Sequence, residues 1–304
     1  MPAANARARG WGLAPSSPSP SSLPSPPPSL SLSVIDTAEA YGFGLSEQLI
    51  AEFRARDGGR SPVIATKFAP LPWRRGRGDV VAAARRSCAR LGASRVGLYQ
   101  CHWPGALPGQ TEAYVLGLSD VLEAGLAAAV GVSNFKASRV EAAAAALGGR
   151  LSTNQVQYSL LYRLPEETDV ISATAGAGAT IIAYSPLAQG LLTGKYEGGG
   201  PLPMGPRAAT ITASRVQAVA PLIAAMRAVG AEHAAGGVPR TPAQVALNWC
   251  MAKGTLPIPG VKNERQAREA AGALGWRMSG AEVAELDAVS ARIAPGLAFP
   301  TEKW

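Results

Sequence analysis

The stretch Asp36-Thr37-Ala38-Glu39-Ala40-Tyr41-Gly42 follows a short apolar run, Val34-Ile35, that is typical of a buried strand. An acidic residue at the end of a strand and a tyrosine five residues later in the next loop are suited to proton transfer. Two later predicted strands end in the same manner, the first at Lys67 and the second at His102. In a barrel of parallel strands the carboxyl ends share one face, where this architecture carries out its chemistry. The sequence therefore predicts an active site at these three strand ends.

Length and composition indicate one globular domain. A chain of 304 residues with 47% hydrophobic content can bury the core of a single barrel. No apolar run reaches the roughly 18 residues of a membrane span, so we expect a soluble protein with no membrane partner. Three cysteines at wide spacing predict neither a disulfide framework nor a metal site, and they are typical of a reducing compartment: Cys88, Cys101 and Cys250.

The charge of the chain gives little support to a nucleic-acid partner. The formal net charge is +8, but the basic residues are mostly dispersed, and the one short cluster is Arg74-Arg75-Gly76-Arg77. Nucleic-acid binding usually needs a larger basic patch or stripe. Binding of a polyanionic dinucleotide is a simpler explanation for part of the positive charge.

Residues 1–32 differ from the rest of the chain. They are rich in Ser and Pro and contain no acidic residue. Such a segment cannot form a packed core, so we predict a disordered tail before a barrel domain at 33–304. Ser-rich, acid-poor composition is also similar to that of a plastid transit peptide, which predicts the plastid stroma, with the cytosol as the alternative. A low-complexity tail, or a start that is not the natural one, would give the same composition.

From Val34 onward, predicted strands and helices alternate, which is the pattern of βαβ units and a parallel sheet. The first helix begins near Leu45 and is expected to stop at Gly58-Gly59. Seven strands are expected, at residues 34–36, 63–67, 96–101, 129–132, 153–156, 180–184 and 256–258. The later helices are expected at residues 80–91, 112–124, 136–147, 166–175, 213–233, 242–252, 264–274 and 280–293.

Seven motifs in order resemble those of the aldo-keto reductases, over residues 34–304, and the later ones are most similar to the plant branch that includes plastid members. They are Asp36–Gly42, Ala65–Lys67, Gln100–Trp103, Gly131–Phe135, Asn154-Gln155, Tyr184–Gly190 and Ile258–Asn263. The resemblance implies an α/β fold, the (β/α)₈ TIM barrel. In that family the strand ending at Asp36 is the second of eight, and no amphipathic helix precedes Val34. We therefore expect a barrel that is incomplete at its N-terminal end.

Four residues are the candidates for catalysis. A tyrosine can protonate a carbonyl oxygen, but its ordinary pKa of about 10 must be lowered, which a neighbouring cation does. The resemblance implies that Tyr41 is the acid, that Lys67 and Asp36 tune it, and that His102 orients the substrate. Taken singly, each has an ordinary structural interpretation, such as an Asx turn for Asp36 or a solvated charge for Lys67. Their occurrence together favours catalysis.

We do not expect a dinucleotide to bind as it does in a Rossmann fold, because no Gly-x-Gly-x-x-Gly fingerprint follows a strand. The resemblance implies that a hydroxyl and two amides, Ser133, Asn134 and Gln155, hold the nicotinamide carboxamide. It also implies an aromatic stacking residue and a pyrophosphate loop, namely Tyr184 with Ser185, Leu187 and Gln189. A helix N-cap is the alternative role for Ser133 and Asn134.

The adenosine end is expected near Lys262 and Asn263, which precede a predicted helix. A helix N-terminus binds phosphate, and the lysine adds a full charge, which favours NADP over NAD because only NADP carries a 2′-phosphate. The resemblance implies further contacts from Gly260, Gln266 and Glu269. The family often has Asn after that Glu, where this chain has Ala270.

The predicted function is NADPH-dependent reduction of a small aldehyde or ketone, with Tyr41 as the general acid and no metal. One alternative is a cofactor-binding regulatory module similar to the barrel subunits of potassium channels. Another is an inactive barrel that does not close. The sequence sets neither the substrate nor the oligomeric state.

Overall fold

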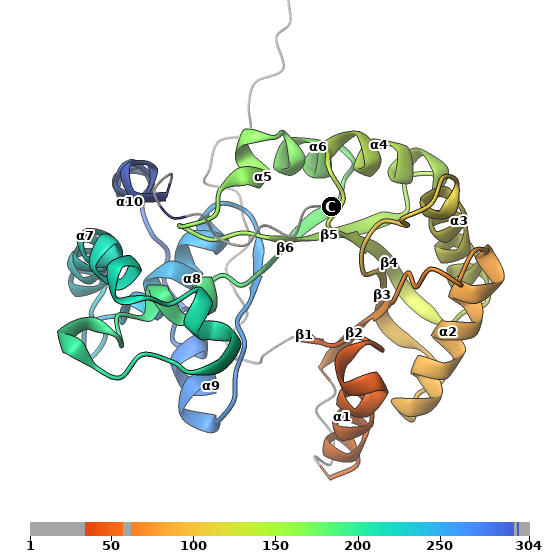
Figure 1. Ribbon diagram of the computed structural model, residues 1–304, viewed down its shortest axis with the longest axis horizontal. Coiled ribbons are helices and arrows are strands. Elements are labelled where there is room, and N and C mark those ends of the chain that lie inside the picture. The colour runs from red at the N-terminus through yellow and green to blue at the C-terminus, as the bar shows by residue number, and fades with distance from the viewer. Residues whose placement is uncertain (1–33, 57–61, 295–296, 298–304) are drawn as a thin grey trace, which may run out of the picture. The chain divides into compact units, whose positions relative to one another are not determined.

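The computed structural model describes residues 34–56, 62–294 and 297. The predicted tail at 1–32 and the predicted helix stop at Gly58-Gly59 lie outside these residues. Within them, seven strands form one sheet in the order β1 to β7, and each strand is parallel to the next. Helices lie along the outer side of this sheet (Figure 1). The expected α/β barrel of parallel strands is confirmed.

All seven strands occur where the sequence predicts them, although β2, β4 and β5 are longer than expected. Their bounds are β1 Val34–Asp36, β2 Val63–Phe68, β3 Val96–Cys101, β4 Ala127–Ser133, β5 Leu151–Gln157, β6 Thr180–Tyr184 and β7 Leu256–Ile258.

Three helix predictions were wrong in their extent. The helix predicted at 80–91 begins earlier, at Arg77. The helix predicted at 166–175 is two helices, because Asp169 adopts a left-handed conformation, φ 56°, between them. The helix predicted at 264–274 ends at Ala271 and is followed by the cap residue Gly272. The helices are α1 Leu45–Arg56, α2 Arg77–Arg90, α3 Gln110–Glu123, α4 Ala137–Ala146, α5 Leu164–Glu167, α6 Val170–Gly176, α7 Ala213–Glu232, α8 Pro242–Ala252, α9 Glu264–Ala271 and α10 Gly280–Ile293. The 3₁₀ turns are η2 Tyr41–Gly44, η3 Ala188–Thr193, η4 Glu197–Gly199 and η5 Gly205–Ala209.

Side-chain caps define where the later helices begin. Thr241 and Gln244 form a capping box at the start of α8, and Ser279 and Glu282 form another at α10. The side chain of Asn263 accepts a hydrogen bond from the third residue of α9. Because these caps satisfy backbone N–H groups that have no partner inside the helix, they fix the first turn of each helix.

The strands present alternate residues to two buried faces. Asp36 and Lys67 share their strand face with Val34 and Ala65, because side chains alternate along a strand. A small apolar cluster on this face includes Val34, Ala65, Leu98, Ala129, Ile182 and Ile258. Two larger clusters fill the space between the other face and the helices. Asp36 and Lys67 therefore lie next to an apolar cluster on the same face of the sheet.

The sheet does not close within the described residues. β1 is paired with β2 alone, and β7 with β6 alone. This agrees with the prediction of an incomplete barrel, since a closed barrel leaves no edge.

A buried carboxylate attaches α1 to the sheet. Glu47 is fully buried and accepts hydrogen bonds from Thr66 Oγ1 and from Arg90 Nε, both at 2.6 Å. Thr37 and Ser46 share a further hydrogen bond of 2.8 Å. Because an unpaired buried charge is costly, these contacts hold α1 against β2 and α2 in one orientation.

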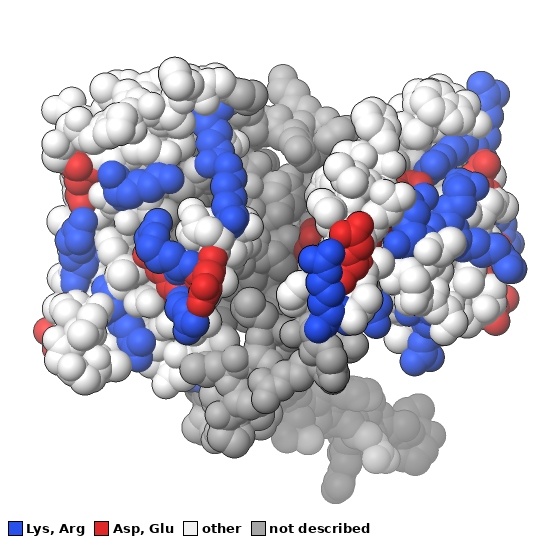
Figure 2. Space-filling model, turned by 90° about the horizontal axis from the view of Figure 1, so that it is seen from below, with Lys and Arg blue, Asp and Glu red and all other residues white. Residues whose placement is uncertain are grey.

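In the described part of the chain, no helix is long and apolar enough to cross a membrane, and no cluster of His, Cys, Asp and Glu could hold a metal ion. On the face shown in Figure 2, Lys and Arg lie in several groups, some with acidic residues against them.

Candidate active site

The structure brings the four predicted catalytic residues together. Asp36 ends β1, Lys67 lies near the end of β2, and His102 directly follows β3. Tyr41 begins the η2 turn. Its ring lies 5.5 Å from the ring of His102, centroid to centroid, at an interplanar angle of 78°. The Nζ atom of Lys67 lies 5.2 Å from the centroid of the tyrosine ring. A cation and an imidazole therefore flank one phenol.

Lys67 is fully buried, and its ammonium is held by two oxygens. Nζ donates to Asp36 Oδ2 at 2.5 Å and to the carbonyl oxygen of Thr37 at 2.9 Å. The other carboxylate oxygen, Asp36 Oδ1, accepts from Gln155 Nε2 at 2.8 Å. Asp36 thus links β1, β2 and β5 across the inner face of the sheet. This use of Asp36 differs from the Asx turn that was its ordinary alternative.

Burial and pairing act on Lys67 in opposite directions. Burial lowers the pKa of its ammonium below the ordinary value, and the charge and hydrogen bond of Asp36 raise it again without restoring it. The pairing is therefore what keeps a buried ammonium charged.

His102 is a neutral imidazole at physiological pH. Burial, and to a smaller extent the charge of Lys67, lowers its pKa from 6.5 to about 3. Its Nδ1 atom is buried and has no hydrogen-bond partner among the described residues. A buried polar atom without a partner calls for a ligand or water. His102 can donate or accept one hydrogen bond, but it is a poor source of a proton.

A tight turn presents Tyr41. Its backbone N–H donates to the carbonyl oxygen of Ala38 at 3.0 Å, and the next two residues, Gly42 and Phe43, have left-handed φ values of 59° and 54°. Glycine adopts that conformation without strain. The side chain of Tyr41 is 42% exposed, so a substrate can reach it.

Ser133, Asn134 and Tyr184 form one hydrogen-bonded group, while the side-chain amide of the third predicted ligand, Gln155, donates to Asp36. Asn134 Nδ2 lies 3.1 Å from Ser133 Oγ and 3.2 Å from the carbonyl oxygen of His102, while its Oδ1 accepts from the hydroxyl of Tyr184 at 3.0 Å. Asn134 is not a helix cap, because Lys136 occupies the N-cap position of α4. It adopts a left-handed φ of 62°. Hydroxyl and amide groups at this place suit a carboxamide, so the residues fit a nicotinamide.

The loop after β6 has unusual backbone geometry. Ser185, Ala188 and Gln189 all have positive φ, between 46° and 57°, although none is glycine. Leu187 lies between them and is half-buried. Such conformations cluster at ligand-binding sites, and they turn backbone N–H groups toward anions. This loop therefore fits a pyrophosphate.

The start of α9 has the polar groups expected of a phosphate site. Asn263 caps the helix, and Gln266 Oε1 accepts from the backbone N–H of Lys262 at 2.8 Å. Arg265 and Arg268 form ion pairs with Glu269 and Glu264 respectively. Lys262 is exposed and has no ion pair within the described residues, and Gly260 in the preceding turn is also exposed. The lysine charge is thus available to an anion.

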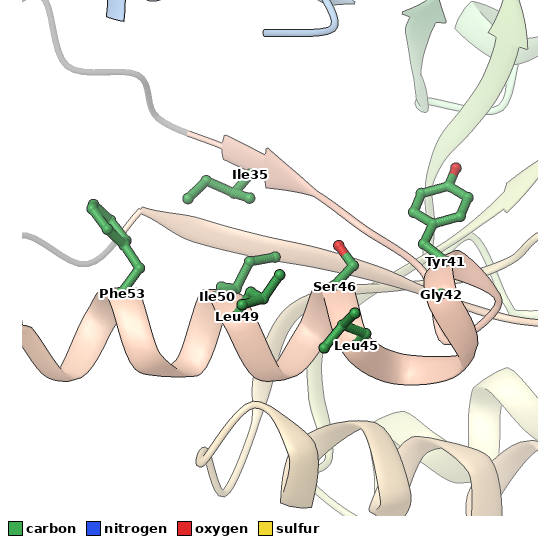
Figure 3. Close-up of a pocket in the computed structure, with 8 residues that line it drawn as sticks. All are labelled: Ile35, Tyr41, Gly42, Leu45, Ser46, Leu49, Ile50 and Phe53. Atoms are coloured by element: carbon green, nitrogen blue, oxygen red, sulfur yellow. The ribbon is translucent and has the colours of Figure 1, made fainter. Parts of the chain in front are cut away.

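An apolar groove of about 500 Å³ begins at Tyr41 and follows α1 (Figure 3). Leu45, Leu49 and Phe53 on α1 are each about half exposed, at 53%, 53% and 52%. Ile35 of the edge strand β1 faces them. The full lining is Ile35, Tyr41, Gly42, Leu45, Ser46, Leu49, Ile50 and Phe53.

Cys101 and His233 do not belong to the predicted site. Cys101 is buried beside His102, and burial raises the pKa of its thiol to about 12, which suits a packing residue. His233 is only partly exposed, because its Nε2 atom lies 2.8 Å from Glu282 Oε1 and its ring packs on Trp276.

Parallel strands, surrounding helices and a polar cluster at the strand ends define an α/β-barrel enzyme. A sequence model of the Aldo/keto reductase family matches residues 29–291. The chain belongs to this family of oxidoreductases.

Individual relatives and solved structures are consistent with this family. The chloroplastic pyridoxal reductase of Arabidopsis thaliana is 37% identical over 268 residues, which cover 84% of this chain and 72% of the relative. An aldo-keto reductase of Klebsiella pneumoniae, solved in complex with NADPH, superposes with a TM-score of 0.64 at 27% identity and covers 86% of this chain and 81% of its own. A glycerol dehydrogenase of Gluconobacter oxydans has a TM-score of 0.72 at 24% identity, over 90% and 85% of the two chains, and supports the fold alone.

His102 should make stability depend on pH. Its pKa is 6.5 when unperturbed and about 3 when folded, so between these values the unfolded chain binds more protons. The free energy of unfolding should therefore fall as pH drops through this window, by up to about 1.4 kcal/mol per pH unit. Urea titrations at pH 7 and pH 4.5 should show a smaller drop for H102N than for the wild type. H233N, which leaves His102 in place, is the control. Parallel behaviour of H102N and the wild type would contradict the prediction.

Proposed function

We propose that the protein reduces an aldehyde or ketone to an alcohol with NADPH, and that Tyr41 gives the proton to the carbonyl oxygen. The supporting observation is the cluster in which Lys67 and His102 flank Tyr41. His102 is neutral at physiological pH and cannot readily supply the proton. The ammonium of Lys67 is fully buried and bonded to Asp36 and Thr37, so the exposed phenol is the acid that a substrate can reach. The neighbouring ammonium favours the ionised form of this phenol.

Each residue of the cluster has a distinct part in this proposal. Asp36 holds Lys67 charged and in place. Lys67 lowers the cost of leaving a phenolate behind. His102 donates a hydrogen bond to the substrate oxygen, which orients the carbonyl toward Tyr41.

The proposed cofactor site has two ends. At one end, Ser133, Asn134 and Gln155 would hold the carboxamide, and Tyr184 would pack on the ring. The loop with Ser185, Leu187 and Gln189 would receive the pyrophosphate. At the other end, Gly260, Lys262, Asn263, Gln266 and Glu269 would receive the adenosine and its 2′-phosphate. When bound, NADPH would supply the hydride that the carbonyl carbon accepts.

The substrate is proposed to be a small carbonyl compound. Because the Arabidopsis relative is named a pyridoxal reductase, pyridoxal is the first substrate to test. Trp73 and Trp103, in the loops after β2 and β3, provide aromatic surface near the strand ends.

Replacement of Tyr41 tests the proton donor. In Y41F, kcat for pyridoxal or another aldehyde should fall by about 100-fold or more, because general acid catalysis typically contributes that much. The dissociation constant of NADPH, followed by quenching of tryptophan fluorescence, should stay within about twofold, because the proposed cofactor contacts are untouched. Turnover retained by Y41F would refute the assignment. A wild type that binds NADPH but reduces no carbonyl would favour the regulatory module instead.

Replacement of Lys262 tests the phosphate site. K262M should weaken NADPH binding about tenfold, or ~1.4 kcal/mol, and leave NADH binding nearly unchanged, because only NADPH carries the 2′-phosphate. R268M is the matched control, since that arginine is already paired with Glu264, and it should weaken NADPH binding less. Equal losses for the two dinucleotides would remove Lys262 from the phosphate site.

We also propose that residues 33–304 form the barrel domain and that 1–32 direct it to the plastid. The tail composition and the chloroplastic relative support this location. The full chain with a C-terminal fluorescent tag should co-localise with chlorophyll in plant cells, and the same chain without residues 1–32 should stay in the cytosol. Cytosolic fluorescence from both would favour the cytosol.

A further inference from the structure

A salt bridge fastens the loop of Tyr41 to the loop that follows Lys67. The carboxylate of Glu39 accepts a hydrogen bond from the backbone N–H of Ala69 at 2.7 Å. It also pairs with Arg74 through both oxygens, with Nη2 lying 3.2 Å from Oε2 and Nη1 bonded to Oε1. Arg74 Nη1 donates in addition to the carbonyl oxygen of Ala69 at 3.0 Å. We call Glu39, Ala69 and Arg74 the loop clamp.

The loop clamp is sheltered from water and rigidly supported. The side chains of Glu39 and Arg74 are only 8% and 15% exposed. The guanidinium lies 5.1 Å from the ring centroid of Phe68, and the carbonyl oxygen of Arg74 accepts from the hydroxyl of Tyr114 and from Gln110 Nε2. Burial lowers the pKa of Arg74, but the hydrogen bond and the charge of Glu39 outweigh it and raise this pKa above the ordinary value. Both the backbone and the side chain of Arg74 are therefore fixed.

The clamp lies next to the turn that presents Tyr41. Glu39 is the second residue of this turn, in which the N–H of Tyr41 donates to the carbonyl oxygen of Ala38. The backbone N–H of Glu39 also points to the carbonyl oxygen of Lys67, at 3.4 Å. One residue thus ties the turn to β2 by its backbone and to the following loop by its side chain.

We propose that the loop clamp holds Tyr41 beside Lys67, so that Glu39 and Arg74 are positioning residues for the proton transfer. This inference rests on the proposed function for the role of Tyr41. Neither residue belongs to the cluster of Asp36, Tyr41, Lys67 and His102. They act through the turn, and the geometry they maintain is the one in which the ammonium stabilises a phenolate.

The pKa of the Tyr41 phenol separates positioning from a direct charge effect. The charged and titratable groups in the cluster around it are Lys67 on β2, His102 after β3, and Asp36 on β1, which is bonded to Lys67. E39Q changes none of these. Removing the carboxylate charge would by itself lower the pKa of the phenol, whereas moving Tyr41 away from Lys67 would raise it. The two explanations predict shifts of opposite sign.

The experiment is a pH titration of the full-length protein labelled with ¹³Cζ-tyrosine, followed by NMR. The chain has seven tyrosines, and the spectrum of Y41F identifies the signal of Tyr41. In the wild type we expect a pKa below the ordinary value of about 10. In E39Q it should rise by about half a unit or more toward that value. R74K keeps the charge of the pair and loses the two-pronged contact, so it should show a smaller rise without any direct charge effect.

E166Q is the matched control, because Glu166 and Arg163 form an ion pair of similar burial away from the site. It should lower the melting temperature, as E39Q does, and leave the Tyr41 signal unchanged. The proposal is overturned if E39Q and R74K leave the pKa of Tyr41 unchanged or lower it, or if E166Q raises it equally. If E39Q does not fold, the pKa of Tyr41 in R74K alone tests the proposal.

Turnover distinguishes this inference from the proposed function. If the wild type reduces no aldehyde but E39Q and R74K still raise the pKa of Tyr41, the clamp stands and the reductase function fails. If the wild type is active, kcat of E39Q should fall about tenfold or more, with the KM for NADPH within about twofold, because misplacement of a reacting group costs rate more than binding.

Discussion

The buried ammonium of Lys67 is the constraint on which the site depends. A charge without contact to water is tolerated only when it is paired and hydrogen-bonded. Asp36 on β1 forms the ion pair with Lys67, and the carbonyl oxygen of Thr37 accepts a second hydrogen bond from its ammonium. Gln155 on β5 donates a hydrogen bond to the carboxylate of Asp36. Three strands are therefore held in register by one side chain. Burial, with a smaller contribution from the same charge, lowers the pKa of His102. The position of Asp36 and the pairing of β1, β2 and β5 therefore follow from placing one lysine on the inner face of the sheet.

Sequence reasoning located the strand ends well, because the apolar runs of the strands are short and distinct. It also identified the four clustered residues, since the topology of parallel strands brings consecutive ends together. The split between α5 and α6 escaped it, because Asp169 in the left-handed conformation is a local event inside an otherwise helical pattern. Asn134 was compatible with either a cap or a ligand. The position of Lys136 at the helix start excludes the cap.

The long-range ionic contacts could not be predicted. Glu39 and Arg74 are 35 positions apart, and Glu47 and Arg90 are 43 positions apart. Nothing in the local pattern indicates that these acids are buried. A glutamate on a helix normally predicts an exposed position, and its burial depends on an arginine that arrives from another helix. Such pairs are set by the packing of elements, which the periodicity of one segment does not encode.

The short outer strands affect how the protein behaves at high concentration. β1 and β7 contain three residues each, and β7 carries Pro257, which has no N–H to offer another chain. Unpaired strands are templates for association between molecules, and short strands with proline are poor templates. Among the described residues, the exposed apolar side chains of Leu45, Leu49 and Phe53 would therefore favour self-association more than the unpaired backbone of β1 and β7. Aggregation of this protein should respond to polar substitutions on α1 rather than to changes in the strands.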